Sequence, residues 1–454
     1  MSTEHQITTL DSGVRVVSER VPGVRSVALG FWIATGSVAE HKDQAGISHL
    51  LEHMLFRGTD RYGSQEIDEI FDAMGAEINA GTDKETTSLY TRVLDRHLEH
   101  AFEVMSDMVW HPRFGELEAE REVVLEEIAM YEDDPQDRVF DALGRAIFGS
   151  HPLGRAVIGT AEVVGGVTRE QLGAFHAERY RPDSIVIAAA GSIDHDALVR
   201  MASAVDAARS ERAGLAPAQA NGHGAQAPAG GVPAALAAAG APDFRPRAQF
   251  LQKDTEQYHV CLGGAGIARD DERRFALRVL EGVLGGTSSS RLFQEVRERR
   301  GLAYSVFTFS NLYASTGEVG LYVGTRPDNL REALAVVAAE LEHCVEGAGG
   351  KPITEKELVR SRENLKGRVV LGMESTGARM SRLGSALLNE MPILSVDEML
   401  ERIDSVEIDA VRAIAAELFT PSRLSAAGVG PAESEFLAAI EPLGAVAEAP
   451  GAAR

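Results

Sequence analysis

Cysteine and positive charge are both scarce in this sequence. The 454 residues include two cysteines, Cys261 and Cys344, so the chain has no disulfide framework and does not require an oxidising compartment. Lysine and arginine together number 45 against 68 aspartates and glutamates, which gives a formal net charge of −23. This surplus of carboxylates argues against a nucleic-acid backbone or an anionic membrane as the main partner, and favours a basic one.

Long apolar runs are missing as well. Residues 1–10 are polar and lack the apolar core of a signal peptide, and no stretch is typical of a transmembrane helix. We therefore expect a soluble cytoplasmic protein of bacterial origin, with neither a nucleic acid nor a membrane as its partner.

The composition is that of a globular protein with a full-sized core, with 44% hydrophobic and 25% charged residues. One segment differs from the rest, because residues 213–242 carry no charge and 23 of these 30 residues are Ala, Gly or Pro. Such a composition is typical of a flexible tether. We predict a domain over residues 1–207, a linker over 208–246 and a second domain over 247–454.

The two predicted domains carry related patterns. Leu89-Tyr90, Leu98 and Ala101 recur 232 residues later as Leu321-Tyr322, Leu330 and Ala333. Similar pairs recur upstream at an offset of 229 and downstream at an offset of 241, as loop insertions would produce. A duplication explains this drift, although chance similarity between two helix-rich segments is the alternative.

Each half mixes strand and helix patterns. Residues 184–193 form a continuous apolar run that predicts a buried strand, and residues 86–94 alternate like a half-buried strand. Asp95 is a candidate N-cap for an amphipathic helix that ends near Trp110. A second long helix is predicted over 114–132, with an apolar face of Leu117, Val124, Ile128 and Tyr131. Strands followed by paired helices predict an α+β fold.

Two histidines one helical turn apart indicate a metal site. His49 and His53 lie at i and i+4 within a stretch of helical pattern, so both imidazoles reach one ion. Glu52 borders the same face. These are the parts of the His-Glu-x-x-His zinc motif in inverted order. The alternative is a solvated helix face with an incidental histidine pair.

A candidate third ligand lies on the second long helix. Glu120 and Glu127 are seven residues apart, so they share one face after two turns, beside the apolar stripe. A half-buried carboxylate is costly unless a metal or a partner meets it. We interpret Glu118, Glu122 and Glu126 as solvated, and Glu127 as a functional residue.

With these motifs the chain resembles the inverted-motif zinc peptidases of the pitrilysin family (M16). It is most similar to the two-domain bacterial processing proteases and the β subunit of the mitochondrial processing peptidase. The resemblance covers nearly the whole chain except the linker. The segments that carry it are residues 46–54, 75–80, 120–127, 151–155 and 290–304.

The resemblance implies a role for each candidate residue. His49, His53 and Glu127 would bind one Zn²⁺ ion per chain, and Glu52 would be the general base. Glu120 would support the site without binding the metal. Substrate would add to a sheet edge near Asn79 and Ala80. Arg297 and Tyr304 would grip the peptide and donate to the oxyanion from the second half.

The resemblance also implies an architecture and an assembly. Two homologous α/β-layered domains would form one half of a clam-shell peptidase, and the chain would pair as a homodimer or as a heterodimer with a related chain. Glu77, Asp83 and Glu85 would favour basic peptides as substrates. In the second half, Arg278 and Gly282 replace the two histidines, so one active site per chain is expected.

Two other classes of function compete with a zinc endopeptidase. A non-catalytic structural or partner subunit, as some relatives have become, would have lost its ligands, whereas this chain keeps all of them. A regulatory metal-binding module would have no need for Glu52. We therefore interpret the chain as a zinc-dependent endopeptidase that acts on extended peptides or unfolded N-terminal segments.

Overall fold

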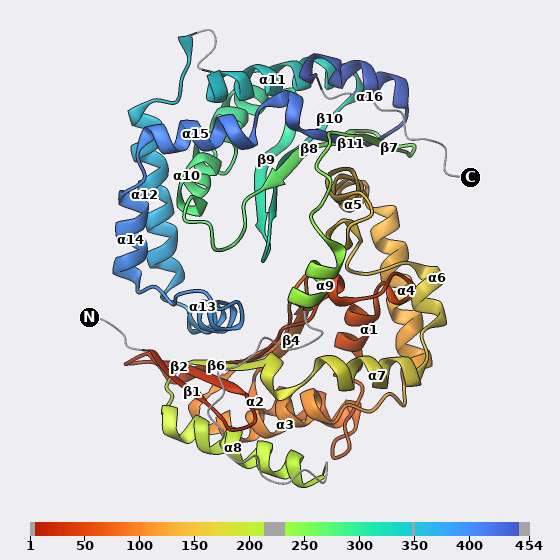
Figure 1. The fold of residues 1–454 in the computed structure, drawn as a ribbon, viewed down its shortest axis with the longest axis vertical. Helices are drawn as coiled ribbons and strands as arrows, with labels where there is room; N and C mark the ends of the chain where they lie inside the picture. Colours follow the sequence, from red (N-terminus) through yellow and green to blue (C-terminus); the bar gives the residue numbers. More distant parts are fainter. Residues whose placement is uncertain (1–4, 213–231, 347–349, 445–454) are drawn as a thin grey trace. The chain divides into compact units, whose positions relative to one another are not determined.

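The computed structural model describes residues 5–212, 232–346 and 350–444. It contains two compact units, each built around one β-sheet (Figure 1). The first unit comprises Met1–Ile128, Ala156–Gly240 and Leu371–Ser395. The second comprises Ala129–Arg155, Ala241–Val370 and Val396–Arg454. The fold is therefore α+β with two domains, as the sequence predicts.

The first unit contains a six-stranded sheet with the order β1-β2-β6-β3-β5-β4. Its strands are β1 (His5–Thr9), β2 (Arg15–Arg20), β3 (Ser26–Ile33), β4 (Glu77–Thr82), β5 (Thr87–Leu94) and β6 (Ile185–Gly191). β2 and β6 are parallel and the other neighbours are antiparallel. Every residue of β6 is buried, which confirms the predicted buried strand, and both of its faces are covered.

Among the described residues, the first unit contains eight helices besides the one that comes from the far end of the sequence. They are α1 (Ile47–Met54), α2 (Ser64–Met74), α3 (Leu98–Trp110), most of α4 (Leu117–Asp133), α6 (Ala161–Gly166), α7 (Arg169–Arg179), α8 (His195–Arg212) and α9 (Val232–Ala239). The last residues of α4, from Ala129 onward, belong to the second unit. The apolar stripes of α1, α3 and α4 form one core with β3 and β5.

A helix from the far end of the sequence covers the other face. α13 (Thr376–Leu388) places Met380, Leu383 and Leu388 against alternate residues of β2, β3 and β6. The approach is close, because a Cβ on Gly30 would lie 2.6 Å from the sulfur of Met380. The first unit is thus completed by residues that lie beyond the predicted linker.

The second unit repeats this plan. Its five-stranded sheet has the order β7-β11-β8-β10-β9, with β7 (Ala248–Gln252), β8 (Tyr258–Gly266), β9 (Ala303–Leu312), β10 (Gly317–Thr325) and β11 (Ser425–Gly430). The parallel β7/β11 pair corresponds to β2/β6 of the first unit. The same strand order in both sheets supports a duplication, with β1 having no counterpart among the described residues.

The second unit is completed by a segment of the first half. α5 (Pro135–Phe148) packs on β8 and β11, and the ring of Phe140 stacks with Phe307 and Tyr322. The other helices are α10 (Arg274–Leu284), α11 (Leu330–Glu346), α12 (Glu355–Gly372), α14 (Val396–Asp404), α15 (Ile408–Leu418), α16 (Glu433–Ile440) and the π-helix η6 (Phe293–Glu298). Each unit therefore includes one helix from the opposite half of the sequence.

Two details of the predicted helices are wrong. The N-cap of the helix that ends at Trp110 is His97 rather than Asp95, because residues 95–97 form a 3₁₀ turn and α3 begins at Leu98. The Asp95 carboxylate instead accepts a hydrogen bond from Arg25 Nε at 2.9 Å. In α4, Leu117, Val124 and Ile128 are buried as predicted, but Tyr131 is 42% exposed.

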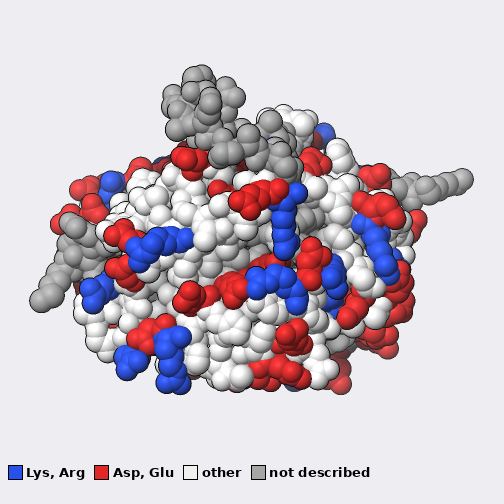
Figure 2. All heavy atoms as spheres, turned by 90° about the horizontal axis from the view of Figure 1, so that it is seen from below, with Lys and Arg blue, Asp and Glu red and all other residues white. Residues whose placement is uncertain are grey.

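The predicted linker lies partly outside the described residues. Residues 213–231 are not described, while α8 extends to Arg212 and α9 occupies Val232–Ala239. Among the described residues, no helix is both long and apolar enough to cross a membrane. Figure 2 shows acidic side chains spread over one face, with basic side chains dispersed among them.

A buried ion pair holds the exchanged helix α13 to the first sheet. Glu19 of β2 has no exposed surface, and its two carboxylate oxygens pair with Arg379 and Arg382 of α13. The Arg382 Nη2 to Glu19 Oε2 distance is 2.8 Å. Removing this carboxylate would leave two partly buried guanidinium groups without their partner.

We therefore expect Glu19→Ala to lower the free energy of unfolding by about 3–5 kcal/mol, measured by urea denaturation. The matched control is Glu118→Ala, since Glu118 pairs with Arg169 at 2.7 Å on the surface of the same unit. That exposed pair should contribute less than about 1 kcal/mol. Equal losses in the two variants would contradict a structural role for Glu19.

Candidate metal centre

The helix α1 presents three functional side chains on one face. Its apolar residues Ile47, Leu50, Leu51 and Met54 are all buried in the core of the first unit. The opposite face therefore carries His49, Glu52 and His53, each of intermediate exposure. The 3.6-residue period of the helix turns the inverted motif into a single cluster.

The start of α1 is fixed by backbone geometry and by a buried carboxylate. Gly46, the N-cap, has a φ of 98°, and a Cβ there would lie 2.7 Å from the carbonyl oxygen of Ile158. Only glycine fits both conditions. The Glu40 carboxylate accepts hydrogen bonds from Gly46 N at 3.0 Å and Ser48 N at 2.9 Å. These contacts satisfy free amides at the helix start and fix the first turn, which carries His49.

The helix α4 brings a carboxylate to both histidines. Glu127 Oε2 lies 3.7 Å from His49 Nε2 and 3.4 Å from His53 Nε2. One ligand atom of each of the three residues lies within 4.8 Å of the other two. This is the only such group of three among the residues that the structure describes. The sequence-predicted ligands thus converge at one point.

Glu120 lies behind the cluster. It is almost fully buried, and its Oε1 accepts a hydrogen bond from His53 Nδ1 at 2.8 Å. Its other oxygen pairs with Arg57. The bond to Nδ1 leaves Nε2 of His53 facing Glu127, the orientation in which a histidine binds a metal. The structure therefore places Glu120 beside the three candidate ligands rather than among them.

The ionisation of the cluster follows from burial and neighbouring charge. Burial, helped by the proximity of His53, lowers the pKa of His49 to about 4. Burial also acts to lower the pKa of His53, but the bond to Glu120 and the nearby carboxylates outweigh it, so that pKa is raised. Burial raises the pKa of Glu52, and hydrogen bonds from Thr82, which act to lower it, only partly offset this effect.

The residues present fit a zinc ion. Two imidazoles and one carboxylate are the donor types of catalytic zinc sites, and His49 is neutral at neutral pH, which is the form that coordinates. Two buried atoms, His49 Nδ1 and Glu52 Oε2, have no hydrogen-bond partner among the described residues. Both atoms belong to the cluster, so a bound ion or a water molecule there could satisfy them.

The other predicted site residues belong to two strands and a π-helix. Asn79 and Ala80 lie on β4, the edge strand of the first sheet, where Asn79 Oδ1 accepts a hydrogen bond from Ala80 N at 2.8 Å. In the second unit, Arg297 of η6 donates from Nη1 to the carbonyl oxygen of Tyr304 at 3.0 Å. Its guanidinium carbon lies 4.3 Å from the centre of the Tyr304 ring, which is 77% exposed.

Sequence reasoning missed two residues of this centre. Arg57 lies three residues beyond the end of α1, where helical spacing no longer predicts its direction, so the sequence offered no clear signal for it. Tyr180, the residue after α7, is buried, and burial together with the Glu52 carboxylate raises the pKa of its hydroxyl against a hydrogen bond with Thr87. No spacing in the sequence links Tyr180 to Glu52.

The second unit lacks an equivalent centre among its described residues. α10 is the counterpart of α1 and carries Arg278, Glu281 and Gly282. A Cβ on Gly282 would lie 2.2 Å from Ser361 Oγ, so the packing there excludes a larger side chain. Burial raises the pKa of Glu281, as it does for Glu52, but the histidines have no replacement.

Comparison with known proteins gives a consistent result. Residues 15–161 match the family described as Insulinase (Peptidase family M16), and residues 166–365 match the Peptidase M16 inactive domain. An uncharacterized zinc protease of Streptomyces coelicolor is 42% identical over 93% of this chain and 89% of its own length. An uncharacterized zinc protease of Bacillus subtilis is 39% identical over 91% of this chain and 95% of its own length.

Solved structures share the fold. A protease from Helicobacter pylori superimposes with a TM-score of 0.82 at 19% identity, covering 95% of this chain and 100% of that chain. A peptidase M16 inactive domain from Pseudomonas fluorescens gives a TM-score of 0.79 at 23% identity, over 94% of this chain and 98% of that chain. At such identities the likeness establishes the architecture alone.

We expect Glu120→Gln to weaken zinc binding by about 10–100-fold, because the neutral amide no longer balances Arg57 and orients His53 less firmly. The measurement is competition for zinc with a chromogenic chelator. The matched control is Glu122→Gln, which removes the same charge from an exposed position of α4. Equal zinc affinity in the two variants would contradict the supporting role of Glu120.

Proposed function

Because the chain belongs to peptidase family M16, whose members use zinc, we propose that it is a zinc-dependent endopeptidase that cuts extended peptides or unfolded N-terminal segments. The observation that carries the proposal is the convergence of His49, His53 and Glu127 within 4.8 Å, with the unpartnered Oε2 of Glu52 on the same helix face. In this proposal the first three residues hold the ion.

In this proposal the residues around the metal centre have different roles. Zinc, when bound, supplies a positive charge that polarises the scissile carbonyl and acidifies a nearby water molecule. Glu52 accepts the proton of the attacking water at its free Oε2 and passes it to the leaving amine. Glu120 and Arg57 keep His53 oriented, so that the ligand face stays in place during the reaction.

Substrate binding is assigned to a sheet edge. β4 is an edge strand with a neighbouring strand, β5, on one side only, and α1 lies beside it. An extended peptide would add there as a further strand, near Asn79 and Ala80. The Asn79 side chain, which now occupies the Ala80 amide, would have to turn away if the peptide takes that amide. The acidic surplus of the chain favours basic peptides.

The proposal extends to the second half of the chain and to assembly. Tyr304 would donate its hydroxyl to the tetrahedral oxyanion, and Arg297 would hold the peptide C-terminal to the cut. Their support is the seven-residue spacing, the contact between them and the high exposure of Tyr304. The active form is proposed to be a homodimer, or a heterodimer with a related chain.

The first test separates the general base from a ligand. We expect Glu52→Gln to keep zinc while cleavage of a peptide library falls at least about 10²-fold, the scale for losing a positioned base. Glu127→Gln replaces an anionic ligand with a neutral one, so its metal affinity should drop and excess zinc should restore part of its activity.

Both variants are compared by metal content and by mass-spectrometric mapping of cut sites, with and without chelator. A Glu52→Gln protein that loses its zinc, or cleaves at a near-normal rate, would remove Glu52 from its assigned role. A wild-type protein that binds zinc but produces no chelator-sensitive cuts would favour a non-catalytic partner subunit.

The second test concerns the second half. Arg297→Ala should lower peptide turnover while the zinc content stays at the wild-type level, and Tyr304→Phe should mainly reduce kcat, because an oxyanion donor acts chiefly in the transition state. Arg331→Ala removes a matched charge from an exposed position of α11 and should change neither constant. Wild-type kinetics in both site variants would exclude these residues from the mechanism.

A further inference from the structure

The proposed general base, Glu52, is held by a residue of the neighbouring edge strand. Glu52 lies on α1, and α1 packs beside β4, which ends at Thr82. Glu52 forms hydrogen bonds with both the side chain and the backbone of Thr82. Its Oε2 has no hydrogen-bond partner among the described residues. Thr82 is therefore in a position to fix the orientation of the Glu52 carboxylate.

The alternation of β4 turns the Thr82 side chain toward α1. Ile78 and Ala80 of this strand pack against the core that contains the apolar residues of α1, and Thr82 follows them with the same period of two. Glu77, Asn79 and Gly81 lie on the opposite face of the strand and are exposed. The Thr82 hydroxyl thus lies on the side of the sheet that carries Glu52.

A line of buried hydroxyl groups lies behind Thr82. Thr82 and Thr87 are paired across β4 and β5, and their Oγ1 atoms are 3.3 Å apart. Thr87 has no exposed surface, and its Oγ1 lies 3.1 Å from the carbonyl oxygen of Thr35. Tyr180 is also buried and forms a hydrogen bond with Thr87. The hydroxyl groups therefore lead from the core of the first unit to Glu52.

The direction of these hydrogen bonds follows from counting hydrogens. A hydroxyl has one hydrogen to donate, and an ionised carboxylate has none. Thr82 therefore donates to Glu52 and accepts from Thr87, whose single hydrogen is shared between Thr82 and the carbonyl oxygen of Thr35. Tyr180 in turn donates to Thr87. Hydrogen bonds that run in one direction strengthen one another, so the buried groups support the bond that Thr82 makes to Glu52.

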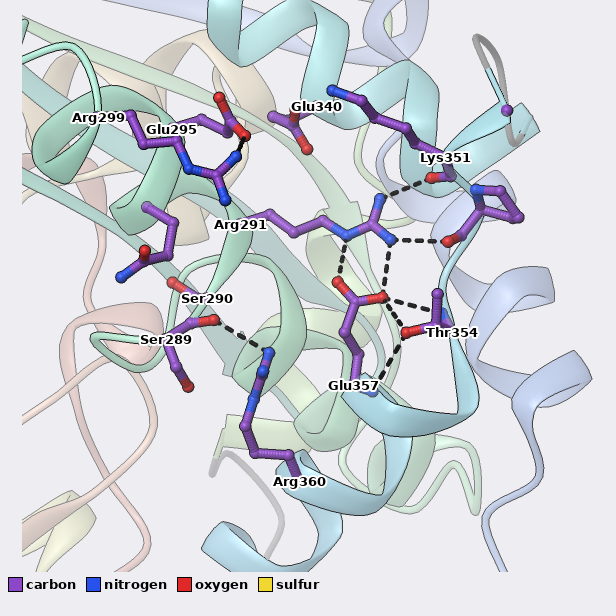
Figure 3. Close-up of a pocket in the computed structure, with 13 residues that line it drawn as sticks. Ser289, Ser290, Arg291, Glu295, Arg299, Glu340, Lys351, Thr354, Glu357 and Arg360 are labelled. Atoms are coloured by element: carbon purple, nitrogen blue, oxygen red, sulfur yellow. Dashed lines mark hydrogen bonds and ion pairs between the residues drawn. The ribbon is translucent and has the colours of Figure 1, made fainter.

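A glutamate with a purely structural role is bonded differently. In the second unit, Arg291 donates to both oxygens of Glu357, at 2.7 and 2.9 Å (Figure 3). Thr354 adds two bonds to Oε2 of Glu357, from its backbone nitrogen at 2.9 Å and from its hydroxyl at 2.8 Å. Both oxygens of Glu357 are therefore engaged, whereas Glu52 is held by Thr82 and has an unpartnered Oε2. A base needs an oxygen that is free to accept a proton, and the arrangement at Glu52 leaves one.

We propose that Thr82 is the positioning residue of the base. Its hydroxyl holds the Glu52 carboxylate in the orientation required for proton transfer, and Thr87 and Tyr180 hold the Thr82 hydroxyl in place. This inference rests on the proposed peptidase function, in which Glu52 is the general base.

The test separates the shape of the Thr82 side chain from its hydrogen bond. Thr82→Val keeps the shape and removes the hydroxyl, whereas Thr82→Ser keeps the hydroxyl and removes a methyl group. Because a hydrogen bond to a charged group is worth about one to two factors of ten, kcat of Thr82→Val should fall at least about tenfold, with KM and zinc content unchanged. Thr82→Ser should keep kcat within about threefold of the wild type. A packing role would give the opposite order.

The matched control is Thr354→Val, which removes a threonine hydroxyl bonded to a carboxylate in the second unit and should change neither kcat nor KM. A second measurement needs no metal. In the zinc-free protein, Thr82→Val should lower the midpoint of urea unfolding by less when Glu52→Gln is already present, because the charged acceptor has then been removed.

Three results would overturn the inference and leave the proposed function in place. They are a wild-type kcat in Thr82→Val, a Thr82→Ser protein no more active than Thr82→Val, and additive effects of Thr82→Val and Glu52→Gln on the unfolding midpoint. A wild-type protein without chelator-sensitive cleavage would instead overturn the proposed function, and the role of Thr82 with it.

Discussion

The cost of burying carboxylates between α1 and α4 is the constraint on which the metal centre depends. Glu120 is almost fully buried and Glu127 is half-buried, so each needs a compensating charge or bond. Arg57 and His53 compensate Glu120, and His49 and His53 face Glu127. A zinc ion would complete this balance. Because Glu120 and Glu127 need positive partners in order to be buried, the space between α1 and α4 favours a cation.

The candidate metal cluster could be predicted from the sequence because it depends on residue spacings within two helices. The i, i+4 spacing of the histidines and the seven-residue spacing of Glu120 and Glu127 fix faces on two helices, and burial of the apolar stripes then turns those faces toward each other. Asp95 shows where local reading fails. Asp95 lies inside a 3₁₀ turn, and its carboxylate pairs with Arg25, a residue 70 positions away. The position of Tyr180 near Glu52 could not be predicted either, because the two residues are far apart in the sequence.

The two units show what a duplicated fold keeps and what it gives up. Both sheets keep the order in which a parallel pair is followed by antiparallel strands. In the second unit, Gly282 sits where close packing against Ser361 leaves no room for an imidazole, so regaining the metal centre would need a change in packing as well as in ligands. The exchange of α5 and α13 could not be predicted, because an amphipathic stripe does not specify which sheet it will cover.

The exchanged helix α13 has a consequence for how the protein is made. The last strand of the first sheet, β6, ends at Gly191, but the helix that covers its second face ends at Leu388. With about 5–20 residues added per second, the apolar residues of β2, β3 and β6 stay uncovered for about 10–40 s after the sheet has emerged from the ribosome. A nascent chain in this state is a natural client for a chaperone, and a stalled or truncated one would be prone to aggregate through that uncovered face.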